Sequence, residues 1–476
     1  MNGTGTVHGA VARQARLRPQ ATAVVCGADR VSYAELDRRA DAYAAELISS
    51  GVRPGGMVPV LLPRSVDLVV ALLAVLKCGA AYAVPDLRWP HVRVQDVIDQ
   101  LDPPLVITRP PMWDPGRVDH IRPAPDDEDA AATVFFTSGT TGRAKGVISP
   151  HRATMRLFAQ PSVRLPIGRT MPQVAPGCWD AFSLELWGML ATGGTSVIVE
   201  TDFLLPQHLR ALTVDTIFLT SALFEVAVDE DIDCFAGIAT VLTGGERMSQ
   251  DHARRFLRRF PTSTLINCYG PVETCVFVTA HRVRPEDCAA AGGVPVGLPM
   301  PHTEVHVLTR TGMAAVGAIG EIGVSGHGLA LGYLNAPALT RERFVTVEVD
   351  GLPRRVYRTG DLGQVTDQGV LHFRGRLDRQ VKIAGHRVEP AELEAVSMSV
   401  PGVRTSRVMP VLAEGGGRNG LALYYTADPG APAPAALRRY LASRLPSYLV
   451  PHTVRRIDAF PFSATGKIDT EALLEL

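Results

Sequence analysis

Short apolar runs alternate with helix-patterned stretches along most of the chain, and this alternation restricts the fold more than any other feature. One helix is marked at both ends, because Ser32 and Glu35 have capping-box spacing and Gly51 follows the last apolar position. Alternating strands and helices are typical of α/β layers with a largely parallel sheet. We therefore predict a multidomain α/β fold, with a helix at 68–77 and strands at 58–62, 105–108, 195–199, 216–220 and 240–242.

The 476 residues are enough for about three folded units. A seam lies near residues 375–379, after which the chain changes to a charged strand, a helix from about Pro390 and a proline-rich linker at 428–434. We therefore predict a large N-terminal core over residues 1–377. A small C-terminal α+β domain over residues 378–476 would follow it.

Lys and Arg number 48 and are balanced by 48 Asp and Glu, so no global field attracts nucleic acid or anionic lipid. The longest apolar run, 68–76, is far short of the ~20 residues of a membrane span, and no apolar signal core begins the chain. The 7 cysteines include no C-x-x-C pair, which favours reduced thiols and a cytoplasmic location. Four arginines at 254, 255, 258 and 259 are better explained as a solvated helix face than as a nucleic-acid surface.

A loop rich in hydroxyls and glycines follows the apolar run 133–136. Its hydroxyl and backbone N–H groups can bind phosphate oxygens, and its lysine adds a positive charge. It is not a Walker A loop, because the G-K-[ST] ending is missing. The candidate phosphate-binding residues are Thr137, Ser138, Gly139, Thr140, Thr141, Gly142 and Lys145.

This loop resembles the phosphate-binding motif of the adenylate-forming superfamily. The chain from about 31 to 469 is similar to amino-acid adenylation domains of nonribosomal peptide synthetases. The matching motifs occur in order: VSYAEL (31–36), LKCGAAYAVPD (76–86), NCYGPVET (267–274), GEIGVSGHGLALGYL (320–334), YRTGDL (357–362), GRLDRQVKIAGHRVEPAELE (375–394), LPSYLVP (445–451) and TGKID (465–469).

The resemblance implies an ATP site. Tyr269 would stack on the adenine, Glu273 would hold Mg²⁺ against the triphosphate, and Asp361 would bind the ribose hydroxyls. Lys467 would reach the substrate carboxylate and the α-phosphate, and with Glu273 and Lys145 it forms the predicted catalytic set. The other ATP-binding positions implied are Gly244, Gly245, Glu246, Asn267, Gly270 and Arg376.

The resemblance also implies an amino-acid pocket. Asp180 lies at the position where the family has the aspartate that pairs with the substrate ammonium, and a buried carboxylate needs such a cation. None of the other positions is charged, so we expect a neutral, apolar aliphatic or aromatic side chain. These positions are Ala181, Leu184, Thr220, Leu242, Gly244, Cys268, Val276 and Phe277.

The expected partner is a carrier protein. Asp378 matches the family's hinge, about which the C-terminal domain would rotate to withdraw Lys467 and bring the strand with Lys382 toward the site. The aminoacyl group would then pass to the phosphopantetheine thiol of a carrier in trans. The chain has no L-G-G-x-S carrier motif, so we expect a free-standing enzyme, with an excised domain as the alternative. A small MbtH-like activator, common with related actinobacterial domains, is a candidate partner.

Some positions depart from the family pattern: Ala144, Val272, Leu331 and Ala384 replace its usual residues, and none of these changes removes a proposed catalytic group.

Three other functions remain as alternatives. A nicotinamide oxidoreductase is suggested only by the glycine spacing of 326–332, which should open a helix after a first strand. A non-catalytic binding module should lack a charged catalytic group. An aryl- or acyl-acid:CoA ligase of the same superfamily would use coenzyme A as the thiol acceptor. Asp180 argues against the usual acids of such ligases, not against that acceptor.

Overall fold

The computed structural model describes residues 5–112, 124–139, 142–158, 165, 169–201, 205–309, 312–383, 385–412, 418–461 and 468–474. The chain divides into two compact units. The first unit comprises Met1–Leu87, Ile98–Phe136 and Gly146–Leu377, and the second comprises Arg88–Val97, Thr137–Lys145 and Asp378–Leu476.

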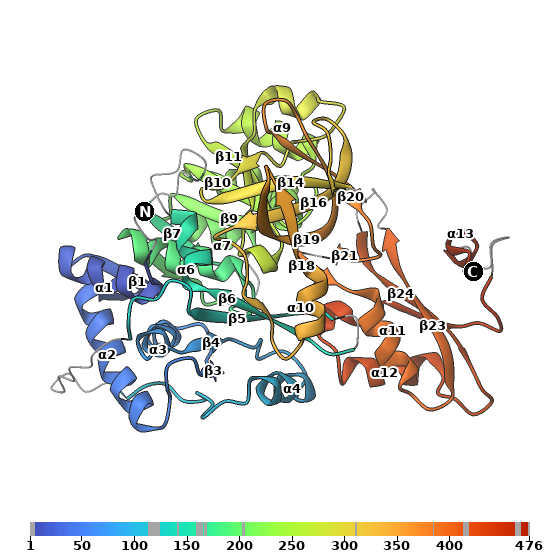
Figure 1. The fold of residues 1–476 in the computed structure, drawn as a ribbon, viewed down its shortest axis with the longest axis horizontal. Coiled ribbons are helices and arrows are strands. Elements are labelled where there is room, and N and C mark those ends of the chain that lie inside the picture. The colour runs from blue at the N-terminus through green and yellow to red at the C-terminus, as the bar shows by residue number, and fades with distance from the viewer. Residues whose placement is uncertain are drawn as a thin grey trace. The chain divides into compact units, whose positions relative to one another are not determined.

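Two sheets and a layer of helices form the N-terminal part of the first unit (Figure 1). One sheet has the order β2-β1-β8-β7 and the other β17-β6-β5-β4-β3. Their strands are β1 (Thr22–Cys26), β2 (Asp29–Ser32), β3 (Met57–Pro59), β4 (Ala81–Ala83), β5 (Ala131–Thr137), β6 (Lys145–Pro150), β7 (Thr170–Gln173), β8 (Thr195–Ile198) and β17 (Gly332–Tyr333).

Two helices of this part begin at serine caps. The Ser32 hydroxyl accepts a hydrogen bond from the Glu35 amide, and the Ser65 hydroxyl accepts one from the Leu68 amide. The helices are α1 (Val7–Leu17), α2 (Tyr33–Ser49), α3 (Val66–Lys77), α5 (His151–Met155) with the 3₁₀ turn η1 (Arg156–Phe158), and α6 (Ala181–Thr192). Helix α4 (His91–Leu101) belongs to the second unit up to Val97.

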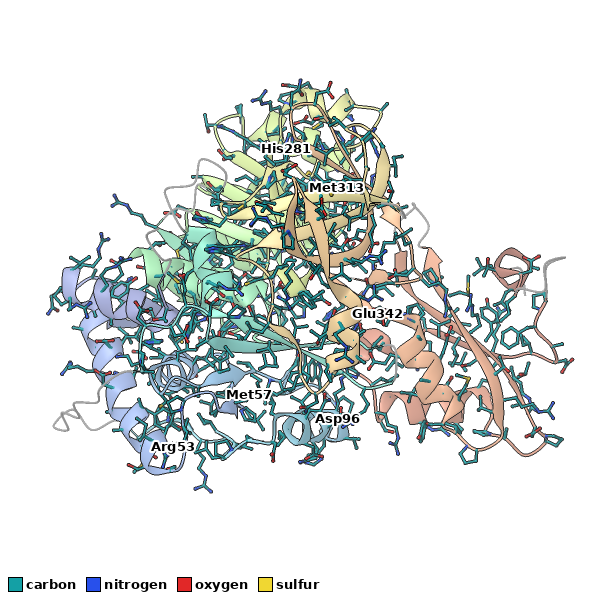
Figure 2. The ribbon with its side chains drawn as sticks, in the orientation of Figure 1. Arg53, Met57, Asp96, His281, Met313 and Glu342 are labelled. Atoms are coloured by element: carbon teal, nitrogen blue, oxygen red, sulfur yellow. The ribbon has the colours of Figure 1, made fainter. Side chains whose placement is uncertain are left out.

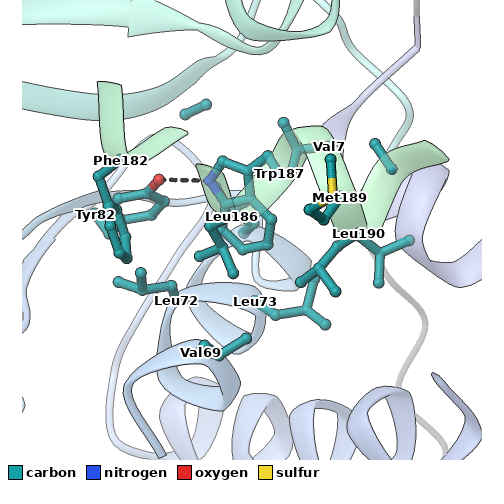
Figure 3. Close-up of a cluster of buried hydrophobic side chains, with 14 of the residues drawn as sticks. Val7, Val69, Leu72, Leu73, Tyr82, Phe182, Leu186, Trp187, Met189 and Leu190 are labelled. Atoms are coloured by element: carbon teal, nitrogen blue, oxygen red, sulfur yellow. Dashed lines mark hydrogen bonds between the residues drawn. The ribbon is translucent and has the colours of Figure 1, made fainter. Parts of the chain in front are cut away.

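Large apolar side chains of α3 and α6 fill the core beside these sheets. Figure 3 shows Leu72 and Leu73 of α3 near Trp187 of α6, whose indole N–H donates to the Tyr82 hydroxyl at 2.7 Å. Trp187 is 1% exposed, so this hydrogen bond satisfies a polar group that burial would otherwise leave without a partner. The apolar run that starts at Leu68 is thus a buried core helix.

A third sheet of the first unit has the order β13-β12-β11-β10-β9, in which β9, β10 and β11 are parallel neighbours (Figure 1). Strand β12 carries His281, which is labelled in Figure 2. The Nε2 of His281 lies 2.8 Å from Oδ2 of Asp287. The elements are β9 (Thr216–Thr220), β10 (Thr240–Gly244), β11 (Thr264–Tyr269), β12 (Thr279–Arg282), β13 (Leu298–Pro299), α7 (Pro206–Ala211), α8 (Ser221–Asp231), α9 (Gln250–Arg259) and the 3₁₀ turns η2 (Ile232–Phe235), η3 (Val272–Thr274) and η4 (Pro285–Ala289).

An antiparallel sheet completes the first unit, with the order β15-β14-β16-β19-β18 and β20 paired to β19. Its long strand β19 pairs with β20 in a register that places Asp361 opposite Arg376. The elements are β14 (Thr303–Thr309), β15 (Gly312–Met313), β16 (Ile319–Gly326), β18 (Phe344–Val349), β19 (Leu352–Val365), β20 (Leu371–Arg376) and α10 (Pro337–Arg343).

The C-terminal segment of the second unit has its own apolar core, which includes Val388, Leu393, Leu423 and Leu437. A two-stranded sheet, β21-β22, and a three-stranded sheet, β23-β24-β25, pack with helices around it. The elements are β21 (Val381–Ile383), β22 (His386–Val388), β23 (Val403–Leu412), β24 (Arg418–Ala427), β25 (Thr453–Arg456), α11 (Pro390–Met398), α12 (Pro434–Ala442), η5 (Ser447–Leu449) and α13 (Thr470–Leu474).

The predicted α/β class, with a large core of layered sheets and a small C-terminal α+β part, is confirmed. The strand predicted at 105–108 is wrong, because only Ile107 forms a bridge, to Val60. The arginine-rich segment is helix α9, and Arg255 and Arg259 pair with Asp229 and Asp233. None of the helices in the described ranges is both long and apolar enough to span a bilayer.

Candidate active site

The carboxyl ends of the parallel strands bring three predicted pocket residues into one row. In the register of β9, β10 and β11, Gly244 lies opposite Thr220 on one side and Cys268 on the other. Leu242, two residues earlier on β10, is fully buried. A Cβ at Gly244 would lie 2.5 Å from the Cys268 carbonyl oxygen, so this position requires glycine. Ligands of α/β proteins commonly bind beyond such strand ends.

The predicted ammonium partner Asp180 lies one residue before α6. Its Oδ2 accepts a hydrogen bond of 2.8 Å from the backbone N–H of Val276. The structure therefore brings together Asp180 and Val276, two predicted pocket residues that are 96 positions apart. Ala181 and Leu184 are buried on α6. Phe277 packs against Phe218 of β9, with ring centroids 5.6 Å apart.

The turn that carries Val276 has an unusual backbone. Cys275 and Val276 have φ angles of 55° and 61°, the left-handed region that non-glycine residues rarely adopt. For a β-branched residue such as Val276 this conformation is a clear outlier, and each residue of this kind costs roughly 1–3 kcal/mol. Strain of this size persists only where surrounding contacts hold the backbone, and the turn lies directly after the predicted metal ligand Glu273.

Three predicted nucleotide-binding residues form a connected polar group. The Tyr269 hydroxyl donates to Oδ2 of Asp361 at 2.6 Å, and Arg376 pairs with Oδ1 of the same carboxylate. Burial first, and then the Asp361 charge, raise the pKa of Tyr269 well above its usual value. The phenol is therefore the proton donor, and it orients the carboxylate between a hydroxyl and a guanidinium.

The other residues predicted to lie near the adenine come from the ends of β10 and β11 and from the loops that follow these strands. The Asn267 amide donates to the Pro295 carbonyl at 2.8 Å, and the carbonyl oxygen of Glu246 accepts from the Ser221 hydroxyl at 3.0 Å. Gly245 has a φ of 92°, and a Cβ at Gly270 would lie 2.4 Å from the Val276 carbonyl oxygen. A left-handed backbone thus explains the glycine at 245, and close backbone approach explains the glycine at 270.

Glu273 is fully buried in the 3₁₀ turn η3, and the Tyr333 hydroxyl donates to its Oε1 at 2.7 Å. Its backbone carbonyl accepts from the Ala330 N–H at 2.9 Å. In the described part of the chain there is no cluster of three or more His, Cys, Asp or Glu side chains that could hold a metal ion. A single carboxylate acting with substrate phosphates is a common protein contribution to a Mg²⁺ site, and Glu273 is chemically suited to it.

The phosphate-loop candidates belong to the second unit. The Ser138 hydroxyl donates to the Arg387 carbonyl at 2.7 Å, and the Gly139 N–H donates to Oε2 of Glu392 at 3.0 Å. Lys145 Nζ lies 3.6 Å from Oε1 of Glu389. Gly142 has a φ of 82°, which favours glycine. Thr137 ends β5, and Thr140, Thr141 and Lys467 lie outside the described residues.

The predicted hinge residue Asp378 is the first residue of the C-terminal segment of the second unit. Its Oδ1 accepts a hydrogen bond of 3.2 Å from the Gln380 N–H, the pattern of a side chain that stabilises a local turn. The preceding residue, Leu377, donates its N–H to the Gly360 carbonyl at 2.9 Å. The hinge role of Asp378 stays a prediction.

Two buried residues near the predicted pocket were not predicted. Glu185 of α6 accepts hydrogen bonds of 2.8 Å from the Val174 and Ala175 amides, which fixes the segment leading to Asp180. Burial raises the pKa of Glu185 to about 8. Arg156 donates to carbonyls of the strained turn. The sequence does offer a signal for Glu185, because it is a charged residue among apolar neighbours. Nothing in the sequence singles out Arg156.

The glycine spacing at 326–332 has no dinucleotide-binding geometry. Gly326 ends β16 and Gly332 begins β17, and no helix opens between them. The pyrophosphate of a dinucleotide would need the N-terminus of such a helix. The oxidoreductase alternative therefore loses its only sequence feature.

The chain matches the family model of the AMP-binding enzyme over residues 11–334. It is 35% identical over 502 residues to malpibaldin synthetase of Mortierella alpina, covering 98% of this chain and 9% of that protein. It is 31% identical over 492 residues to gramicidin S synthase 2 of Brevibacillus brevis, covering 98% of this chain and 11% of that protein. The chain thus spans a small fraction of these curated relatives.

Solved structures agree with this relationship. The structure of holo-PA1221, a nonribosomal peptide synthetase protein containing adenylation and PCP domains bound to a vinylsulfonamide inhibitor, superposes with a TM-score of 0.89 at 33% identity. That match covers 99% of this chain and 84% of the other. An o-succinylbenzoate CoA synthetase from Bacillus subtilis has a TM-score of 0.83 at 21% identity over 98% of both chains, which shows a shared fold alone.

Proposed function

The chain belongs to the AMP-binding enzyme family and, within it, to the adenylation domains of nonribosomal peptide synthetases; on that premise we propose that it activates an amino acid with ATP and passes it to a carrier protein. The first step forms aminoacyl-AMP and releases pyrophosphate. The second step transfers the aminoacyl group to the phosphopantetheine thiol of the carrier. The observation that carries the amino-acid assignment is the Asp180 carboxylate, held by the Val276 amide at 2.8 Å beside neutral side chains.

Charge pairing supports an ammonium-bearing substrate. Asp180 is followed by buried Ala181 and Leu184 on α6, and it bonds to the strained turn that also carries Phe277. An α-ammonium group would neutralise the carboxylate in these apolar surroundings. The neutral pocket positions favour an apolar aliphatic or aromatic side chain on the amino acid.

The connected group of Tyr269, Asp361 and Arg376 supports binding of the nucleoside. A carboxylate with two acceptor oxygens can bind the two ribose hydroxyls, and the Tyr269 ring can stack on the adenine. The phenol and the guanidinium hold the Asp361 carboxylate in one orientation. Orientation before binding reduces the entropy lost when ATP binds.

The first step needs two anions to approach each other. The substrate carboxylate oxygen forms a bond to the α-phosphorus while the bond from that phosphorus to the bridging oxygen breaks, and pyrophosphate leaves. Lys467 would neutralise the negative charge of the carboxylate and the α-phosphate. Lys145 would neutralise the charge of the leaving phosphates. Bound Mg²⁺ would supply further charge neutralisation at the phosphates. Glu273 would hold it there, and no protein nucleophile is required.

The second step needs a thiol at the adenylate carbonyl. The thiol sulfur forms a bond to that carbon, its proton passes to solvent, and the bond from that carbon to the phosphate oxygen breaks as AMP leaves with the electron pair. We propose that rotation about Asp378 withdraws Lys467 and turns the strand with Lys382 toward the site. A carrier protein supplies the thiol, and an MbtH-like protein is a candidate activator.

ATP–pyrophosphate exchange tests the proposal, measured across amino acids and their des-amino analogues. Exchange that depends on one or a few neutral apolar amino acids is the expected result. Exchange supported only by aryl or fatty acids, with coenzyme A as the acceptor, would instead favour the acyl-CoA ligase alternative. No exchange for any acid, with or without an added MbtH-like protein, would contradict the proposed activity and leave the non-catalytic alternative.

A further inference from the structure

A completely buried guanidinium lies inside the first unit, outside every predicted role. Arg156 follows α5 and has an exposed fraction of 0%. Burial lowers its pKa to about 10, so it is still a cation at neutral pH. Within the described part of the chain it forms no ion pair, and the longer-range attraction of Asp180 favours its charged form. Burying an arginine without a carboxylate partner is costly, which calls for a specific explanation.

The contacts of Arg156 concentrate on the strained turn. Its Nη2 donates to the carbonyl oxygens of Thr274 and Phe277, both at 2.7 Å. These carbonyls flank Cys275 and Val276, the two residues with positive φ. The guanidinium therefore bridges both ends of the turn and satisfies carbonyls that this backbone conformation turns inward. The other two guanidinium nitrogens also donate, Nη1 to the Ala153 carbonyl at 2.9 Å and Nε to the Thr303 hydroxyl at 3.2 Å. The single nitrogen of a lysine cannot serve all of these acceptors.

The same turn also contacts the predicted ammonium partner. The Val276 N–H donates to Asp180 at 2.8 Å, so the turn binds a cation through its carbonyls and a carboxylate through one of its amides. We propose that Arg156 is the positioning residue of the amino-acid subsite, because it holds the turn that orients Asp180 and places Val276 and Phe277. This inference rests on the proposed amino-acid activation and names a residue that positions the groups on which its selectivity depends.

The predicted nucleotide-binding groups are held by other contacts. Tyr333 and the Ala330 amide hold Glu273, and Asp361 pairs with Tyr269 and Arg376. Loss of Arg156 should therefore disturb the amino-acid subsite more than the ATP site. A residue that only stabilised the fold would affect both substrates alike, so the two KM values separate the two roles.

Gly328 provides a second way to disturb the guanidinium. A Cβ at Gly328 would lie 2.4 Å from Nη2 of Arg156, and all three of the nearest atoms belong to this guanidinium. The substitution Gly328→Ala therefore displaces Arg156 while every charge is kept. Arg355 is a matched control, since it donates to the Ala330 and Leu331 carbonyls at 2.8 Å and does not touch the strained turn.

The experiment compares Arg156→Met, Arg156→Lys, Gly328→Ala, the double variant Arg156→Met/Gly328→Ala, and Arg355→Met. The readouts are KM for the amino acid, KM for ATP, selectivity for the amino acid over its des-amino analogue, and melting temperature. We expect Arg156→Met and Gly328→Ala to raise the amino-acid KM roughly 10–100-fold, because a shift of about 1 Å in the groups that bind a substrate has effects of this size. The ATP KM should stay within about threefold of the wild-type value. Selectivity for the ammonium should fall, and Arg355→Met should resemble the wild type.

The double variant makes the test independent of general destabilisation. Once Arg156 is absent, Gly328→Ala has nothing to displace, so it should add no further loss. Three results would each overturn the inference. The losses of the two single variants could add in the double variant, or the single variants could raise both KM values equally. The amino-acid KM could also stay unchanged in Arg156→Lys and Gly328→Ala. If Arg156→Met does not fold, Gly328→Ala and Arg156→Lys decide. A wild type without amino-acid-dependent exchange refutes the proposed function itself, whereas an active wild type with unaffected variants refutes only the role of Arg156.

Discussion

Removing the hydroxyl of Tyr269 should weaken ATP binding without removing the ring that stacks on adenine. In Tyr269→Phe, Asp361 loses the donor at 2.6 Å and keeps only Arg376 as a described side-chain partner. A buried acceptor that loses its donor costs roughly 1–3 kcal/mol. We expect ATP KM to rise about tenfold, since ~1.4 kcal/mol corresponds to a factor of ten. Initial-rate kinetics at saturating amino acid measure this change.

The matched control is Tyr333→Phe, which removes the hydroxyl that donates to Glu273 at 2.7 Å. It should affect the Mg²⁺ dependence of the rate more than ATP KM at saturating Mg²⁺. An unchanged ATP KM in Tyr269→Phe would show that the orientation of Asp361 does not matter for nucleotide binding.

At the residue scale, motif matching predicted which residues line the pocket, and the register of β9, β10 and β11 brings three of them together. Thr220, Gly244 and Cys268 come from three separate strands and lie in one row. Arg156 could not be predicted, because its role depends on two carbonyls of a turn 118 and 121 residues away. A sequence shows residue types and local spacing, whereas a buried cation that binds main-chain carbonyls has no local pattern.

At the scale of elements, a pair of buried histidines should make stability depend on pH where α1 meets α5. The rings of His8 and His151 lie 5.3 Å apart, and the Val7 N–H donates to Nδ1 of His151, which must be unprotonated to accept it. Burial lowers the pKa of His8 to about 4 and of His151 to about 3. Asp126 opposes this shift at both rings, and Lys77 adds to it at His8.

The sign of the effect follows from these pKa values. Both histidines bind protons in the unfolded chain below pH 6.5, but in the folded chain only near pH 4 and 3. Stability is therefore lost as pH falls from about 6.5 toward 4, by roughly 1–2 kcal/mol for each histidine at pH 5. Urea unfolding at pH 7 and pH 5 measures the loss.

The double variant His8→Gln/His151→Gln should reduce the difference in unfolding free energy between pH 7 and pH 5. The control His91→Gln changes an exposed residue and should keep the wild-type difference. A double variant with the full wild-type difference would show that other groups cause it.

Elements with local signals were predictable, and elements that depend on distant partners were not. Helices α2 and α3 carry serine caps and apolar faces that are visible in the sequence alone. The apolar run at 105–108 has the pattern of a strand, but only Ile107 meets a neighbouring segment, at Val60. Whether a short apolar run joins a sheet depends on which strand edge it reaches, and its own residues do not specify that.

At the scale of the whole molecule, Lys467 should matter for adenylation and little for thioester formation. If it acts through charge in the first transition state, Lys467→Ala should slow adenylation roughly 10²–10³-fold. Transfer from a supplied aminoacyl adenylate to the carrier should change little. Single-turnover assays of the two steps measure this, and equal losses in both would contradict a two-pose cycle.

A proline at Asp378 should separate the two half-reactions by restricting φ at the predicted hinge. We expect Asp378→Pro to keep one half-reaction and to lose most of the other. Asp378→Ala removes the carboxylate that accepts from the Gln380 N–H but leaves φ unrestricted, so it should support both steps. If both substitutions leave both steps intact, the pivot lies elsewhere.

The proposed amino-acid activation depends most on Asp180 as the partner of a substrate ammonium. Asp180→Asn keeps an oxygen that can accept from the Val276 N–H and removes the charge. Breaking a buried ion pair typically costs ~3–5 kcal/mol, or roughly 10²–10³-fold in kcat/KM. The measurement is ATP–pyrophosphate exchange by wild type and Asp180→Asn, each with the best amino acid and its des-amino analogue. We predict a loss of that size for the amino acid and none for the analogue. A wild type that prefers the des-amino acid, or a variant that loses kcat/KM equally for both substrates, would contradict the pairing of Asp180 with a substrate ammonium.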